Sequence, residues 1–132
     1  MIDIASLNAN ELVTKLKSGD LSSVELCKLY IKRINEFEKD VQAWSFLDKK
    51  ILLEKAEEAD EYRKSGKPLG PLHGLPIAIK DIIWTYDMPT ECGTVFRKKM
   101  SSSQDSEIVN LLKTAGAIIM GKTVTCELAY IH

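Results

Sequence analysis

The chain has 132 residues, a length that suits one domain, and its 45% hydrophobic and 28% charged residues are ordinary for a soluble globular protein. Its formal net charge of -1 provides no overall field, so neither nucleic acid nor an acidic membrane is expected as a partner. The cysteines Cys27, Cys92 and Cys126 are odd in number, widely spaced and without a CxxC pair. This argues against a disulfide framework and for a reducing, cytoplasmic location. The sequence predicts neither a signal peptide nor a membrane-spanning helix.

Local signals predict that residues 1–66 form a mainly helical segment. Either Asn8 or Asn10 can cap a first short helix, and Gly19 stands where a glycine ends such a helix. Ser22 and Glu25 have the spacing of a capping box, in which each side chain accepts a hydrogen bond from a free backbone amide at the helix start. A second helix is therefore expected to begin there.

A short strand and a third helix complete this N-terminal segment. The stretch Val41–Leu47 contains two aromatic residues and predicts the strand. Asp48 can cap a helix that runs to about Ser65, because the stretch is rich in Ala, Glu and Lys and Gly66 follows it.

The pattern changes after Gly66, and residues 67–132 are predicted to be the start of an α/β core. The prolines and glycines of GKPLGPLHGLP exclude regular helix. The apolar run Leu75–Ile79 then predicts a buried strand, which Ile82–Thr85 either continues or reverses. A long polar loop, Asp87–Ser103, follows.

A fourth helix and a further buried strand are expected after that loop. The helix is predicted from about Gln104 to Ala115, with Ser103 as its cap, and Gly116 ends it. The strand is predicted at Ala117–Met120. A helix followed by a strand across a glycine turn is typical of α/β architecture, here a mixed sheet flanked by helices.

The last residues, GKTVTCELAYIH, contain no clear closing element for this sheet. Buried strands need covering on both faces, and few elements remain to supply it. We therefore expect an incomplete domain. The alternative is a complete small α/β domain that closes with a helix near Cys126–Ile131.

Two lysines that follow apolar strands are candidates for chemistry. Lys80 can point into a cleft beside the sheet, where desolvation would lower its pKa and favour a neutral amine, or its charge can reach solvent or Asp81. Lys122 follows a turn-type glycine and is expected to be an ordinary solvated lysine. Gly116 and the GKT sequence formally match a P-loop, but the residues between are apolar and strand-like, so nucleotide binding is rejected.

The histidines offer no metal site, because His73 and His132 lack partners at ligand spacing. His73 is expected to orient backbone in its loop. A catalytic pair of a histidine with Cys92 or Cys126 has only the residue types in its favour. No nucleophile elbow of the GxSxG type is present.

Three ordered motifs resemble the N-terminal part of the amidase signature family. They are LSSVELCKLYIKRI at Leu21–Ile34, GPLHGLPIAIKD at Gly70–Asp81, and AGAIIMGKTVTCELA at Ala115–Ala129. The second motif is highly specific, and the order of the motifs with the segments between them extends the resemblance over nearly the whole chain. The resemblance implies the first elements of an α/β/α fold with a mixed sheet flanked by helices. Leu128 and Cys126 depart from the residues that are usual in the third motif.

The resemblance also implies a chemistry in which Lys80 is the base of a Ser–cis-Ser–Lys triad that hydrolyses a small carboxamide. No cofactor or metal is implied. The family's two serines lie beyond the third motif, so the chain alone is expected to be inactive. Its expected partners are an amide substrate and either the missing C-terminal part or a second copy. The alternatives are the A subunit of a tRNA-dependent amidotransferase and a non-catalytic fragment that binds through a sheet edge.

Overall fold

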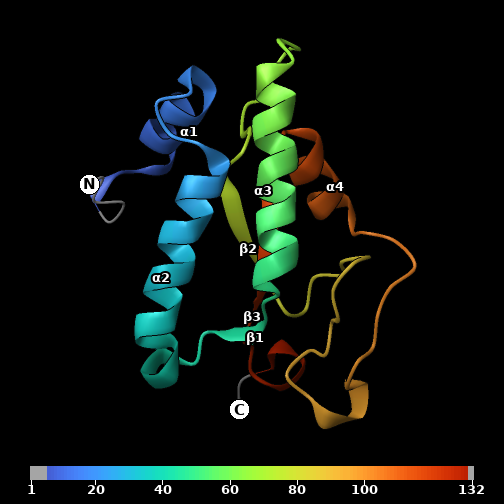
Figure 1. The fold of residues 1–132 in the computed structure, drawn as a ribbon. Coiled ribbons are helices and arrows are strands. Elements are labelled where there is room, and N and C mark those ends of the chain that lie inside the picture. Colours follow the sequence, from blue (N-terminus) through green and yellow to red (C-terminus); the bar gives the residue numbers. More distant parts are fainter. Residues whose placement is uncertain (1–5, 131–132) are drawn as a thin grey trace.

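The computed structural model describes residues 6–130 and contains a small mixed sheet between two layers of helix (Figure 1). Strands β2 and β3 are parallel, β1 is antiparallel to β3, and the order in the sheet is β1-β3-β2. The predicted α/β class with a mixed sheet is therefore confirmed. The elements are α1 (Ala9–Ser18), α2 (Ser23–Val41), β1 (Trp44–Phe46), α3 (Lys49–Lys64), β2 (Pro76–Lys80), the short helix η2 (Val95–Arg97), α4 (Glu107–Thr114), β3 (Ile118–Thr123) and the short helix η3 (Glu127–Ala129).

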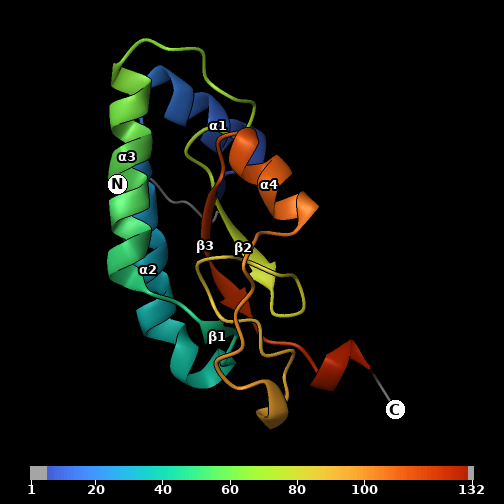
Figure 2. The same ribbon diagram turned by 90° about the vertical axis from the view of Figure 1, so that its right-hand side faces the viewer.

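The two faces of the sheet are covered by different helices. Helices α2 and α3 lie side by side on one face and α4 lies on the other (Figure 2). On the first face Ile118 and Met120 of β3 pack with Leu52 and Ala56 of α3. On the second face Ile119 packs with residues that include Val109 of α4. Strand β3 thus contributes to both cores, which explains its apolar sequence.

The predicted helix caps are confirmed for the first three helices. The side chain of Asn8, rather than Asn10, accepts from the amides of Asn10 and Glu11, and Ser22 and Glu25 form the second capping box. Asp48 accepts from the amides of Lys50 and Ile51 at the start of α3. Each cap uses groups within three residues, so the local sequence is sufficient to specify it.

The prediction for the start of α4 is wrong. The helix begins at Glu107 with Ser106 at the cap position, and the Ser106 hydroxyl makes no capping hydrogen bond. Ser106 is extended, and both it and Asp105 bond to partners that are distant in sequence. The amide of Ser106 donates to the Trp84 carbonyl at 3.0 Å, and the Asp105 carboxylate accepts from the Tyr86 amide at 2.7 Å. These contacts prevent the helix from starting at Gln104.

Strand β3 extends past its predicted end and includes Gly121, Lys122 and Thr123. Its last two residues pair with β1. Gly121 permits this pairing, because a Cβ at this position would lie 2.6 Å from the carbonyl oxygen of Phe46. A strand of this length places Lys122 inside the sheet rather than after it.

Two further sequence expectations are resolved at the ends of strands. Residues Ile82–Thr85 do not continue β2, because the Ile83 amide donates to the Lys80 carbonyl in a turn. The C-terminal helix considered near Cys126–Ile131 is the single short turn η3, in which Leu128 has a φ of 51°; Ile131 and His132 lie outside the described residues. Across residues 6–130, no helix is long and apolar enough to cross a membrane.

Candidate functional site

Lys80 is the last residue of β2 and is paired with Thr123 of β3. Its side chain is exposed, so the burial expected at the strand end is not observed. The amine has no hydrogen bond or ion pair to any side chain or carbonyl of residues 6–130. In this chain Lys80 therefore presents an unpaired amine at the end of a core strand.

The neighbouring Asp81 is turned into the protein and is only 2% exposed. Its carboxylate accepts from the Glu91 amide at 3.1 and 3.3 Å and lies 3.5 Å from the Nζ of Lys122. The pairing of Lys80 with Asp81, one of the two alternatives for Lys80, is therefore wrong. Asp81 pairs with a lysine from the adjacent strand.

Lys122 is fully buried, which contradicts the expectation of a solvated lysine. Its ammonium lies 2.9 Å from the Ile83 carbonyl oxygen and 3.1 Å from that of Pro89. The hydroxyl oxygens of Thr90 and Thr85 lie at 2.6 and 3.4 Å. Burial lowers the pKa of Lys122, and the negative charge of Asp81 opposes that shift.

The sequence contained one usable signal for this burial. The strand runs without a polar break into Gly121 and Lys122, and the segment after Lys80 contains two threonines that can accept hydrogen bonds. That signal does not identify the hydrogen-bond partners of Lys122, because the oxygens that accept from its ammonium lie 32 to 39 positions before it along the chain.

His73 orients backbone, as expected. It is buried, its Nε2 lies 3.1 Å from the Ala59 carbonyl oxygen, and its ring centroid lies 5.8 Å from that of Tyr62. Burial lowers the pKa of His73 and the contact with Ala59 opposes this shift. The Sγ of Cys92 instead lies 3.0 Å from the Arg97 guanidinium. His73 and Cys92 therefore have separate partners and do not form a catalytic pair.

A cavity of about 710 Å³ lies away from Lys80. It is open and is lined by α3, the loop around Gly70 and His73, and the first residues of β3. The cavity lies at the start of β3, whereas Lys80 lies at the end of β2 and does not line the cavity. Among residues 6–130, no three His, Cys, Asp or Glu side chains are grouped to hold a metal ion.

Comparison with known proteins places the motif around Lys80 in a family. A family model described as Amidase matches residues 25–132. The chain belongs to the amidase family. Its fold agrees: it aligns with a peptide amidase from Stenotrophomonas maltophilia with a TM-score of 0.86 at 30% identity, covering 95% of this chain and 26% of that one. A fatty acid amide hydrolase aligns with a TM-score of 0.85 at 32% identity, covering 92% and 22%.

Curated relatives are named as components of an amidotransferase. The chain is 38% identical over 122 residues to the A subunit of the glutamyl-tRNA(Gln) amidotransferase from Rhodopirellula baltica, covering 92% of this chain and 24% of the relative. It is 36% identical over 129 residues to the corresponding subunit from Salinispora tropica, covering 98% and 26%. The chain therefore spans about a quarter of the length of these relatives.

Proposed function

We propose that this chain supplies the lysine base of an amidase that hydrolyses a carboxamide C–N bond. Lys80 is the base of a Ser–cis-Ser–Lys triad, and both serines come from a further part of the amidase domain. The neutral amine accepts a proton through the middle serine from the nucleophilic serine, which attacks the amide carbonyl. Water then resolves the acyl-enzyme. Lys80 is the residue of GPLHGLPIAIKD that carries this role by motif match.

The observation that carries this proposal is the different environment of the two lysines. The carboxylate of Asp81 is engaged by the buried Lys122, although Lys80 is its neighbour in sequence. Lys80 consequently has no ion pair among residues 6–130 that would hold its amine out of reach of a serine. An unpaired amine at the end of a core strand is available to act as a base once an apolar environment surrounds it.

The chain by itself is expected to be inactive, because Lys80 makes no hydrogen bond to a serine among residues 6–130 and the resemblance assigns both serines of the triad to a further part of the domain. The test is ammonia release from a simple amide such as propionamide by the purified 132-residue chain. No turnover above buffer is expected. If the chain hydrolyses the amide and Lys80→Met abolishes this activity, the proposal that both serines of the triad lie outside this chain is contradicted.

The role of Lys80 is tested in a hybrid in which this chain replaces the matching quarter of the Stenotrophomonas maltophilia peptide amidase. Lys80→Met in an active hybrid should lower kcat by about 10²-fold or more, the usual contribution of a positioned general base. The matched control is Lys64→Met, which removes an exposed lysine at the end of α3. An unchanged kcat in the Lys80 variant would refute its role as the base.

The second candidate function is that of the A subunit in an amidotransferase, which the curated relatives at 36 to 38% identity favour. The sequence TVTCELAY favours a free-standing amidase slightly, because the A subunits usually have asparagine after GKT. A second hybrid, in which this chain replaces the matching quarter of the Rhodopirellula baltica A subunit, separates these candidates when it is compared with the peptide amidase hybrid. Undiminished glutamine hydrolysis, stimulated by tRNA and a partner protein, in the A-subunit hybrid alone would support the amidotransferase. Undiminished amide hydrolysis in the peptide amidase hybrid alone would support the free-standing enzyme.

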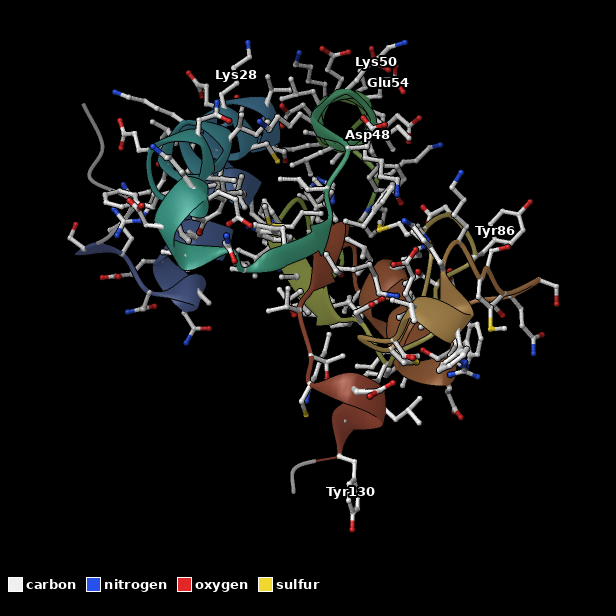
Figure 3. All side chains as sticks on the ribbon, turned by 90° about the horizontal axis from the view of Figure 1, so that it is seen from below. Lys28, Asp48, Lys50, Glu54, Tyr86 and Tyr130 are labelled. Carbon is white, nitrogen blue, oxygen red and sulfur yellow. The ribbon has the colours of Figure 1, made fainter. Side chains whose placement is uncertain are left out.

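Exposed apolar side chains indicate where the further part of the domain would pack. Val95 and Phe96 of η2 are 81% and 90% exposed, and Leu128 of η3 is 60% exposed. Tyr130 also projects away from the body of the molecule (Figure 3). The amide of Leu128 donates to the Cys92 carbonyl, which brings the two segments together. Large apolar side chains that are exposed in this way mark interaction surfaces, and we assign these to contacts with the remainder of the amidase domain rather than with a second copy.

A further inference from the structure

The ammonium of Lys122 is enclosed by oxygen atoms from a single segment of the chain. Two backbone carbonyl oxygens come from Ile83 and Pro89, and two hydroxyl oxygens come from Thr85 and Thr90. A carboxylate oxygen comes from Asp81. All five oxygens lie in the loop that follows β2. An ammonium group has three donors and no acceptor, so a cage of acceptors from one loop holds that loop around it.

The same loop is closed by contacts of Asp81. The amide of Asp81 donates to the Thr123 carbonyl at 2.9 Å, and its own carbonyl accepts from the Cys92 amide at 3.0 Å. Its carboxylate accepts from the Glu91 amide. The start of the loop is therefore fixed to β3 and to the end of the loop, and the charge of Lys122 compensates the carboxylate at its centre.

Lys122 and Lys80 are neighbours across the sheet but lie on opposite faces. Lys122 is paired with Ile79 in the parallel register, and Lys80 with Thr123. Paired residues share a face and successive residues alternate. The two side chains are therefore not in contact across the sheet, and only the backbone and Asp81 connect them.

We propose that Lys122 is a positioning residue for Lys80. Its ammonium fills the oxygen cage, orders the loop from Asp81 to Thr90, and withdraws the Asp81 carboxylate from Lys80. The catalytic purpose of this arrangement rests on the proposed function of Lys80. The ordering of the loop by Lys122 does not depend on that function, so an experiment can refute either one and leave the other standing.

The test uses the 132-residue chain and amide hydrogen exchange measured by NMR. Lys122→Ala should accelerate exchange at the amides of Asp81, Glu91 and Cys92 by about tenfold or more relative to α3, as expected for local opening. It should also shift the backbone and side-chain signals of Lys80. Lys113→Met is the control, since it removes a different ion pair, at 2.6 Å to Asp105.

Chemical rescue distinguishes a cation cage from a general loss of packing. n-Propylammonium should restore slow exchange and the Lys80 signals in Lys122→Ala, whereas 1-propanol should not. Lys122→Met should resist rescue, because its side chain occupies the space of the lysine stem. Equal rescue by 1-propanol, or unchanged Lys80 signals in a folded Lys122→Ala variant, would overturn the proposal.

The unsubstituted chain provides a measurement that does not depend on a variant folding. The Nζ protons of Lys122 should exchange with water at least about tenfold more slowly than those of the exposed Lys80, because exchange requires the cage to open. Equally fast exchange of both ammonium groups would overturn the proposal. Slow exchange of Lys122 combined with full activity of a Lys80→Met hybrid would instead reject only the function proposed for Lys80.

Discussion

Asp60 of α3 caps the N-terminus of α2 across the helix pair. Its Oδ1 accepts from the Ser23 amide at 2.8 Å and its Oδ2 accepts from the Val24 amide at 3.1 Å. Asp60 is 7% exposed, so water does not replace these bonds readily. Together with the capping box of Ser22 and Glu25, the carboxylate satisfies amides that a helix start leaves free.

Asp60→Ala should lower the free energy of unfolding by about 1.5 to 3 kcal/mol, because one buried and one partly buried amide lose a charged acceptor. Urea denaturation followed by circular dichroism measures this change. Glu57→Ala is the control on an exposed face of the same helix and should change stability by less than about 0.5 kcal/mol. Equal effects of the two substitutions would show that the carboxylate of Asp60 contributes nothing specific.

His73 should make the stability depend on pH below neutrality. Burial lowers the pKa of His73 from its ordinary 6.5, so between the folded and unfolded values the unfolded chain binds more protons. The stabilisation is present above about pH 6.5 and is lost as the pH falls toward the folded pKa. Denaturation midpoints between pH 7.5 and 5.5 should fall less steeply for His73→Gln. Parallel pH profiles for the two chains would contradict this assignment.

Only one of the three thiols should react rapidly in the folded chain. Cys126 is exposed, whereas Cys27 and Cys92 are buried. Burial raises the pKa of Cys27 to about 12, which leaves almost no thiolate at pH 8. Titration with an aromatic disulfide reagent should show one fast equivalent, and denaturant should release the remaining two. Persistence of the fast phase in Cys126→Ser would contradict this prediction.

Gly121→Ala should loosen the pairing of β1 with β3. The new Cβ would lie 2.6 Å from the Phe46 carbonyl oxygen and 2.9 Å from the ring of Trp44. Overpacking of this kind typically costs about 1 to 3 kcal/mol. In a Trp84→Phe background, fluorescence reports Trp44 alone, and its emission should shift to the red as β1 separates. Unchanged emission and stability would show that the strands adjust without cost.

Lys80 and Lys122 should differ sharply in their effect on stability. Lys80→Met removes an exposed amine that has no partner among residues 6–130 and should change the free energy of unfolding by less than about 0.5 kcal/mol. Lys122→Met leaves the buried Asp81 charge uncompensated and should cost about 3 to 5 kcal/mol. Adding Asp81→Asn to Lys122→Met should recover part of that loss, as measured by a double-mutant cycle. Simple additivity would exclude coupling between the two groups.

Local signals in the sequence were sufficient for the helix starts, since the caps at Asn8, Ser22 and Asp48 use amides no more than three residues away. The start of α4 was not predictable in the same way. Its position depends on Trp84 and Tyr86, which lie about twenty residues earlier and bond to Ser106 and Asp105. A capping signal competes poorly with such tertiary hydrogen bonds.

The sequence by itself determined the amidase motifs, the mixed α/β pattern and the place of Lys80 at the end of a core strand. Only the tertiary structure decided that Lys80 is exposed and without a partner among residues 6–130, and that Lys122 is buried. Two lysines after apolar strands look alike in sequence, because burial depends on which oxygens the fold brings to each amine. Here one loop supplies five oxygens to Lys122, and Asp81 turns toward it and away from Lys80.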